Sequence, residues 1–299
     1  MGFTAHTRGF LQIQQGCDHR CTFCIIPYGR GPNRSVPVDR VIAEAETLLR
    51  QGHAEIVLTG VDMASYGQDM EPPDRPAVAL LVRRLLRALP GLPRLRLSSL
   101  DCTAVDDDLL ELFATEPRLA PHLHLSLQAG DDLTLKRMAR RHSRQDAIRA
   151  CAALRRVRPG IALGADLIAG FPTETARMFA GSLSLVEACG LVWLHVFPYS
   201  ERDGTPAARI PRQVPPAVRR QRAALLRARG EQAAENFLRG QTGKLVSVLA
   251  EQENGGRSEH FAPVRFDRPV TPGGLVDARV TGVADGCLLA MPLSSRAAA

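Results

Sequence analysis

Short strand-like runs of apolar residues alternate with amphipathic helical stretches over roughly the first 200 residues of the chain. The strand candidates are Phe10–Gln14, Glu55–Thr59, Arg94–Ser98, His122–Leu127, Ile161–Ile168 and Leu191–Phe197. The helix candidates between them are Val38–Arg50, Ala77–Leu89, Asp106–Thr115, Leu133–Met138, Arg144–Arg156 and Thr175–Ala188. This alternation predicts an α/β fold whose parallel strands are joined by right-handed crossovers. Six such units are too few for a closed eight-stranded barrel, so we expect an open or partial barrel.

The pattern changes after Phe197. Five prolines between residues 198 and 216 indicate an irregular connector, and a long polar helix is expected over Pro216–Arg239. Short strands with glycine and proline between them follow, which predicts a small OB-like barrel. These strand candidates are Lys244–Ala250, Phe261–Phe266, Leu275–Thr281 and Cys287–Met291. The predicted domains are an α/β domain at 1–212, a connecting basic helix at 213–240, a β-barrel at 241–292 and a disordered tail at 293–299.

The composition excludes a mainly disordered, collagenous or coiled-coil chain. Of the 299 residues, 45% are hydrophobic and 23% are charged, and both values are ordinary for a globular protein. No apolar run reaches the roughly 18 residues that span a bilayer, and the first residues lack a secretion signal. We therefore expect a cytoplasmic protein without a membrane partner.

The charge balance favours a polyanionic partner, with nucleic acid the first candidate. The chain carries 38 basic and 31 acidic residues, a formal net charge of +7. Only Lys136 and Lys244 are lysines, and the other 36 basic residues are arginines. Because genome base composition can produce the same arginine bias, the charge alone leaves nucleic-acid binding open.

Three of the seven cysteines, Cys17, Cys21 and Cys24, lie within eight residues directly after the first predicted strand. The odd number of cysteines and the lack of an export signal argue against a disulfide framework. Thiolates at this C-x3-C-x2-C spacing can wrap three corners of a cubic iron–sulfur cluster and leave its fourth iron open. A structural zinc site is the alternative, and it needs His19 or a distant residue as its fourth ligand.

This cysteine loop, with Phe23 before the last cysteine and a βα pattern around it, resembles the radical S-adenosylmethionine (SAM) superfamily. A closer resemblance, to the methylthiotransferase family, rests on several segments that appear in order along nearly the whole chain. These segments are Gln15–Gly31, Val57–Asp62, Arg96–Leu100, Pro121–Gly130, Asp166–Thr175 and His195–Ser200. The combination is most similar to the branch that acts on N6-threonylcarbamoyladenosine at position 37 of tRNA. The resemblance implies a partial (β/α)6 radical SAM barrel followed by a small RNA-binding TRAM domain.

The resemblance also implies a set of SAM contacts at the ends of the strands. These residues are Phe23, Gly60, Val61, Asp62, Ser98, Gln128 and Gly170. Phe23 and the neighbourhood of Gly170 would face the adenine, and the turn at 60–62 would approach the methionyl amine. Ser98 and Gln128 would meet the SAM carboxylate or ribose. Each polar residue in this set is also an ordinary strand-end cap or turn former.

In the family, the loop cysteines hold a 4Fe–4S cluster whose open iron binds SAM, a role that carries to Cys17, Cys21 and Cys24. The resemblance implies a 5′-deoxyadenosyl radical that removes hydrogen from C2 of the adenine, which then receives a methylthio group. A flavodoxin-type reductant is the implied electron donor. Full family members carry a further N-terminal domain, whose three cysteines hold an auxiliary cluster that supplies the sulfur. We therefore expect either a truncated chain or a sulfur-donating partner, and SAM cleavage without sulfur insertion by this chain alone.

RNA binding is expected along the basic stretch at 202–229, which holds eight arginines and one acidic residue. Arg219, Arg220 and Arg222 are the predicted contacts to the tRNA anticodon loop, and a solvated helix face is the alternative. A second basic cluster lies at 136–144. Two other functions stay open: a catalytically silent RNA-binding fragment with an empty or zinc-filled cysteine loop, and a methylthiotransferase that acts on a ribosomal protein.

Overall fold

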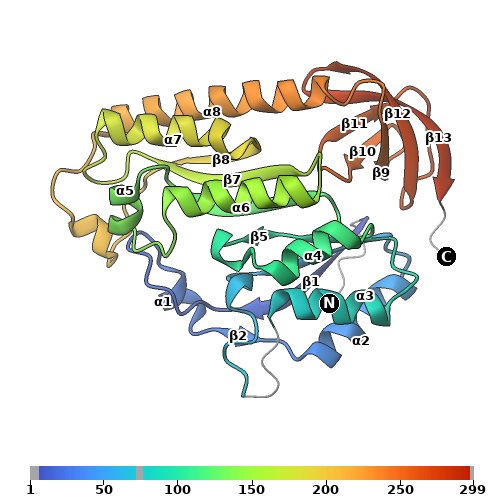
Figure 1. Cartoon of the computed structure of the whole chain (residues 1–299), viewed down its shortest axis with the longest axis horizontal. Coiled ribbons are helices and arrows are strands. Elements are labelled where there is room, and N and C mark those ends of the chain that lie inside the picture. The colour runs from blue at the N-terminus through green and yellow to red at the C-terminus, as the bar shows by residue number, and fades with distance from the viewer. Residues whose placement is uncertain (1–6, 72–76, 297–299) are drawn as a thin grey trace.

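The computed structural model describes residues 7–71 and 77–296. Two mainly parallel sheets follow each other in chain order, β2–β1–β3–β4 and then β5–β6–β7–β8 (Figure 1). Their strands are β1 (Arg8–Gln15), β2 (Arg34–Ser35), β3 (Glu55–Gly60), β4 (Arg94–Leu97), β5 (Ser99–Leu100), β6 (His122–Gln128), β7 (Ala162–Ala169) and β8 (Leu191–Pro198). The short strand β2 runs antiparallel to β1, and the other pairs described in these sheets are parallel. The predicted α/β class is confirmed.

The two sheets meet where β4 passes into β5. Ser98 alone separates these strands, and its N–H donates to the carbonyl of Leu58 in β3 at 3.1 Å. Leu100 of β5 then pairs with Leu125 of β6. The strand predicted at Arg94–Ser98 is therefore β4, the edge strand of the first sheet, and the chain passes through Ser98 into β5, the edge strand of the second.

Helices α2, α3, α4, α6 and α7 pack their apolar sides against the two sheets (Figure 1), and α5 packs through Leu135 into a separate cluster at the end of β7. They are α2 (Val38–Arg50), α3 (Val78–Ala88), α4 (Asp107–Thr115), α5 (Asp132–Arg137), α6 (Arg144–Val157) and α7 (Ala176–Cys189). Local sequence sets their ends: Ser143 and Asp146 form a capping box at the start of α6, and Gly190 ends α7 with φ +63°. No helix in the described part of the chain is both long and apolar enough to cross a lipid bilayer.

Helix α8 (Pro216–Arg239) lies along α7 and β8 and leads into the C-terminal barrel (Figure 1). It buries Ala223 and Leu226 while most of its other side chains are exposed. Gly230 allows the close approach to β8, because a Cβ there would lie 2.9 Å from Leu194 Cδ1. The long polar helix predicted from the sequence is present with these bounds.

The C-terminal strands form a closed barrel in the order β10–β11–β13–β12–β9. They are β9 (Leu245–Gln252), β10 (Gly255–Ser258), β11 (Pro263–Phe266), β12 (Leu275–Ala284) and β13 (Cys287–Arg296). Strand β13 pairs with β12 as far as Arg296, opposite Leu275. The disordered tail predicted at 293–299 is therefore wrong for residues 293–296, and 297–299 lie outside the described residues.

The barrel contacts the amino-terminal ends of the parallel strands. The first residues of β1, β3 and β4 meet there: the buried Glu55 carboxylate accepts hydrogen bonds from Arg8 at 2.8 Å and from Arg94 at 3.1 Å. Arg94 in turn donates to the carbonyl and hydroxyl oxygens of Ser247 in β9, at 2.8 and 2.7 Å. Because the barrel occupies this end, the opposite, carboxyl ends of the strands are left for a site.

Candidate functional site

The cysteine loop leaves β1 through a turn that only glycine allows. Gly16 has φ +73°, and a Cβ there would lie 1.8 Å from the carbonyl oxygen of Pro32. Cys17 then donates its N–H to the Gly31 carbonyl at 3.0 Å. The short helix α1 (Ile26–Arg30) follows the loop. The loop is thus folded back against the segment that leads to β2.

The far side of the loop is tied to the end of α5 and to the connector before α8. Thr22 donates its N–H to the Met138 carbonyl at 3.1 Å and its hydroxyl to the Arg137 carbonyl at 2.7 Å. Its own carbonyl accepts from the N–H of Ala207 at 2.9 Å. The loop therefore connects the end of β1 with the end of α5 and with the connector before α8, and it crosses the carboxyl ends of the strands.

The three loop thiols lie close enough to influence one another. Burial, together with negative charge on Asp62, Cys21 and Cys24, raises the pKa of the Cys17 thiol to about 11. Burial also raises the pKa of Cys24, as does charge on Cys21. Three adjacent thiolates in this loop therefore need positive charge beside them, which an iron–sulfur cluster supplies. The donor set fits a cluster held by three cysteines.

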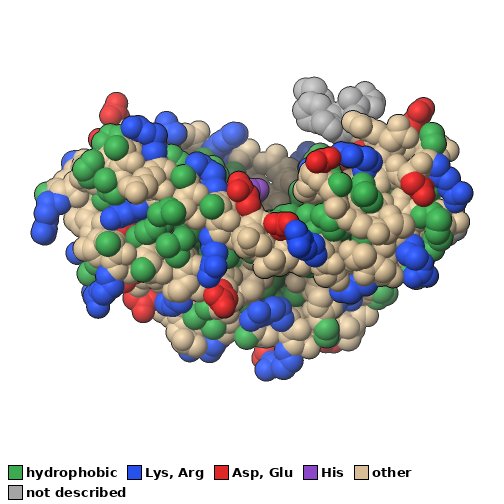
Figure 2. All heavy atoms as spheres, turned by 90° about the horizontal axis from the view of Figure 1, so that it is seen from above, with side chains coloured by type: hydrophobic (Ala, Val, Ile, Leu, Met, Phe, Trp, Pro, Cys, Tyr) green, Lys and Arg blue, Asp and Glu red, His purple; other side chains and the backbone are tan. Residues whose placement is uncertain are grey.

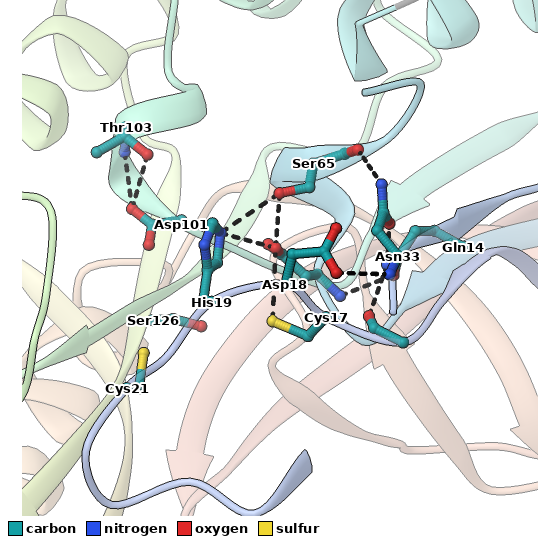
Figure 3. Close-up of polar contacts among 12 residues, drawn as sticks. Gln14, Cys17, Asp18, His19, Cys21, Asn33, Ser65, Asp101, Thr103 and Ser126 are labelled. Atoms are coloured by element: carbon teal, nitrogen blue, oxygen red, sulfur yellow. Dashed lines mark hydrogen bonds and ion pairs between the residues drawn. The ribbon is translucent and has the colours of Figure 1, made fainter. Parts of the chain in front are cut away.

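The imidazole of His19 lies against the side chains of Asp62 and Ser65. Its Nε2 lies 3.3 Å from Ser65 Oγ (Figure 3) and 2.8 Å from Asp62 Oδ2. Burial works against ionisation of Asp62, but hydrogen bonds from His19 and Ser65 outweigh it and lower the pKa of this carboxyl. Asp62 also accepts from the Cys17 thiol at 3.7 Å. In the structure Asp62 holds the loop through His19 and Cys17, and its predicted approach to SAM stays a prediction.

A buried amide pair supports the same loop and was not predicted from the sequence. Gln14 Nε2 donates to Asn33 Oδ1 at 2.6 Å (Figure 3), and Gln14 Oε1 accepts the Asp62 N–H at 2.8 Å. A Cβ on Gly60 would lie 3.0 Å from Gln14 Oε1 and 2.7 Å from Met63 Cγ. Position 60 is therefore glycine because the side chains of Gln14 and Met63 leave no room for a Cβ.

Arg140, in the segment between α5 and α6, contacts the loop. One guanidinium nitrogen donates to Asp101 Oδ2 at 2.7 Å and to the Ser126 carbonyl at 2.6 Å, and the other donates to Cys21 Sγ at 3.5 Å. Burial raises the pKa of Asp101, but Arg140 and the hydrogen bonds from Thr103 outweigh it, so the net shift is downward. Arg140 places positive charge against the Cys21 thiol. The sequence showed it only as part of the basic cluster at 136–144 and did not predict this contact.

A cavity of about 340 Å³ opens beside the cysteine loop, within the size range of small-molecule sites. Two of the predicted SAM contacts, Phe23 and Gln128, line it together. The other lining residues are Asp166, Ile168, Phe197, Pro198, Tyr199, Ser200 and Arg202. Gln128 ends β6 with φ +71°, a left-handed conformation that a glutamine adopts at a cost. Phe197 to Ser200 follow a predicted strand, and this position at a strand end could have identified them from the sequence as lining residues of the cavity.

The other predicted SAM contacts lie outside this cavity. Val61 is partly exposed, and Ser98 donates its hydroxyl to Met63 Sδ at 3.7 Å. Gly170 is buried against α8: a Cβ there would lie 2.6 Å from Arg219 Cγ, and its N–H donates to Glu174 at 2.7 Å. The structure places Gly170 itself against α8, and the approach of its neighbourhood to the adenine of SAM stays a prediction.

The arginines of α8 divide into buried and exposed groups. Arg219 is 7% exposed, donates to the carbonyls of Val214 and Tyr199 at 2.5 and 3.2 Å, and pairs with Glu201 at 2.7 Å. Arg222 donates to the Glu174 carboxylate at 2.8 Å. The predictions that these two bind RNA are corrected, because their guanidinium groups hold the fold together.

Arg220 is exposed, as are Arg227 and Arg229 on the same helix. Figure 2, which looks from above onto the α8 side of the molecule, shows Lys and Arg side chains spread over much of this face. The basic surface here is therefore broader than the three arginines singled out from the sequence.

Residues 11–186 match the family model described as the Radical SAM superfamily, and the chain belongs to that superfamily. It is 46% identical over 284 residues to the threonylcarbamoyladenosine tRNA methylthiotransferase MtaB of Rickettsia prowazekii, covering 95% of this chain and 67% of the relative. It is 36% identical over 250 residues to the MtaB of Bacillus subtilis, covering 84% and 55%. Within the superfamily, the chain belongs to the MtaB-like methylthiotransferase family.

The comparisons also give the share of each relative's length that the chain covers. It spans between 55% and 67% of the length of the two curated relatives. Among solved structures, it is similar to coproporphyrinogen III oxidase (HemN) of Escherichia coli, with a TM-score of 0.55 and 16% identity over 77% of this chain and 54% of that one. The methyltransferase TsrM of Kitasatospora setae, solved with a [4Fe-4S] cluster, gives 0.53 and 18% over 67% and 38%. At these identities the two structures show the fold alone.

Proposed function

We propose that the chain carries the radical-generating and RNA-binding parts of an enzyme that adds a methylthio group to C2 of N6-threonylcarbamoyladenosine at position 37 of tRNA. The observation that carries the proposal is the loop of Cys17, Cys21 and Cys24 crossing the carboxyl ends of the parallel strands beside a cavity. The names of the relatives supply the substrate. In this proposal the two sheets form the partial (β/α)6 barrel and β9–β13 form a TRAM-like domain.

The three cysteines would hold a 4Fe–4S cluster, and SAM would bind beside it. When bound and reduced, that pair supplies a 5′-deoxyadenosyl radical. The chain's own residues position the pair: Arg140 donates to the Cys21 thiol, and Asp62 with His19 fixes the loop at Cys17. Phe23 and Gln128 are the cavity residues proposed to meet SAM.

Three partners complete the proposal. A flavodoxin-type donor supplies the electron, and the tRNA anticodon loop reaches the cavity, guided by exposed arginines such as Arg220. The sulfur comes from a domain or partner that the described residues do not provide. Such an enzyme acts in the cytoplasm, where tRNA is modified.

Anaerobic reconstitution with iron and sulfide, followed by an assay for 5′-deoxyadenosine with SAM and a strong reductant, tests the proposal. Cys21→Ala should abolish the product, because the cluster loses one of its three ligands. Cys287→Ala, in the barrel, is the matched control and should leave product unchanged. Product from the Cys21 variant, or zinc in place of iron in the wild-type chain, would overturn the cluster assignment and favour an RNA-binding protein without catalysis.

A further inference from the structure

A histidine–aspartate–histidine cluster lies on one face of the second sheet, outside the cysteine site. Asp166 Oδ1 on β7 lies 3.0 Å from His124 Nε2 on β6 and 3.3 Å from His195 Nδ1 on β8. The two imidazole rings lie against each other with their centroids 4.4 Å apart and their planes tilted by 30°. Gly164 makes room for this arrangement, because a Cβ there would lie 2.5 Å from His124 Nδ1. One carboxylate oxygen therefore holds both rings.

The cluster borders the cavity beside the cysteine loop. Side chains two residues apart on a strand share a face, so Asp166 shares its face with Ile168, and His195 shares its face with Phe197. Asp166, Ile168 and Phe197 all line the cavity. Asp166 is thus both a wall of the cavity and the anchor of the two histidines.

Solvent exposure of the side chains increases across the cluster from His124 through Asp166 to His195. The side chains of His124 and Asp166 are 7% and 21% exposed, whereas that of His195 is 63% exposed. With Nδ1 against Asp166, His195 presents Nε2 away from the carboxylate. A protonated imidazole donates a charge-assisted hydrogen bond from that nitrogen, and carboxylates are strong acceptors for it. Arg202, also exposed, lines the same cavity and adds a second cationic donor.

We propose that His195, held by Asp166 and His124, binds the carboxylate of the threonine portion of the substrate base and so selects the threonylcarbamoylated tRNA. This inference rests on the proposed function and adds the residue that sets its specificity. A threonylcarbamoyl group ends in a carboxylate, whereas unmodified adenine and its dimethylallyl derivative are neutral at that position. A site built to pair with one polar group discriminates strongly against substrates that lack it.

The test is binding of anticodon stem-loop RNAs to the reconstituted 299-residue chain, measured by fluorescence anisotropy. Three RNAs differ only at position 37, which carries threonylcarbamoyladenosine, adenosine or the neutral dimethylallyl derivative. We expect wild-type protein to bind the first about tenfold more tightly than the other two, which corresponds to about 1.4 kcal/mol. His195→Ala should lose this preference while its affinity for the adenosine RNA stays the same.

His53→Ala, at the turn between α2 and β3, is the matched control and should keep the preference. Thermal unfolding should be unchanged in His195→Ala, because this side chain is largely exposed. A retained preference in His195→Ala overturns the inference, and an equal loss for all three RNAs assigns His195 to a backbone phosphate and also overturns it.

Three further results would count against the inference. A stoichiometric non-iron metal whose removal abolishes the preference would make the cluster a metal site. Equal wild-type binding of all three RNAs refutes the specificity while leaving tRNA binding in place. Failure to bind any of them overturns the proposed RNA substrate as well.

Discussion

Glu55→Gln should destabilise the junction between the parallel sheets and the barrel. The Glu55 carboxylate is fully buried and pairs with Arg94 and Arg96, which are 4% and 2% exposed. Neutralising it leaves these guanidinium groups without their counter-charge. Removing one partner of a buried ion pair costs about 3–5 kcal/mol, and because glutamine keeps part of the hydrogen bonding we expect about 3 kcal/mol.

The same pairs predict a pH dependence. Burial alone would raise the pKa of Glu55, but Arg96, Arg94 and Arg8 together hold it well below its ordinary value. A carboxyl with a lowered pKa in the folded state contributes stability above its unfolded pKa and loses that contribution as pH falls toward its folded pKa. The gap in unfolding free energy between wild type and variant should therefore be constant near neutral pH and narrow in acid.

Urea unfolding followed by tryptophan fluorescence measures this effect. The chain has one tryptophan, Trp193, whose Nε1 donates to the His260 carbonyl at 3.0 Å on the sheet–barrel boundary. Glu111→Gln is the control, because Glu111 forms an exposed pair with Arg83, and such pairs contribute little. If the Glu55 and Glu111 variants unfold at the same urea concentration, the account of a buried charge network at this junction is refuted.

Three further predictions use substitutions in the cysteine loop, beside it and on α8. Gly16→Ala should displace the cysteine loop and lower the iron content after reconstitution, whereas Gly29→Ala, with open space around its Cβ position, should retain iron. Arg140→Gln removes positive charge beside a cluster thiolate and should make the midpoint potential more negative in a redox titration followed by electron paramagnetic resonance (EPR); an unchanged potential contradicts this. Arg220→Ala should weaken tRNA binding and flatten its salt dependence, whereas Arg219→Ala should lower thermal stability instead; the reverse pattern would contradict their assigned exposure.

Periodicity predicted the long elements because their burial is regular. Strand β7 is almost entirely buried and α2 buries residues at helical spacing, so both patterns are visible in the sequence. Strand β10, Gly255–Ser258, has no apolar residue and was missed; it exists because Gly256 lies against β9, where a Cβ would be 1.9 Å from the Leu249 oxygen. Such contacts depend on the partner strand and leave no local signal.

In the candidate site, too, local features could be predicted from the sequence and contacts between distant residues could not. The cysteines were predictable because ligands on one short loop must be close in sequence. The Gln14–Asn33 pair and the contact of Arg140 with Cys21 join residues far apart in the chain, and only folding brings them together. Arg219 was misassigned because charge density on a helix does not show which arginine turns inward.

The most direct test of the central claim is the EPR spectrum of the reduced, reconstituted chain before and after addition of SAM. Three cysteine ligands leave one iron open, so SAM should change the signal of the reduced 4Fe–4S cluster, and Cys21→Ala should show no such cluster signal. A cluster signal that SAM leaves unchanged, in protein with full iron and sulfide content, would contradict the account.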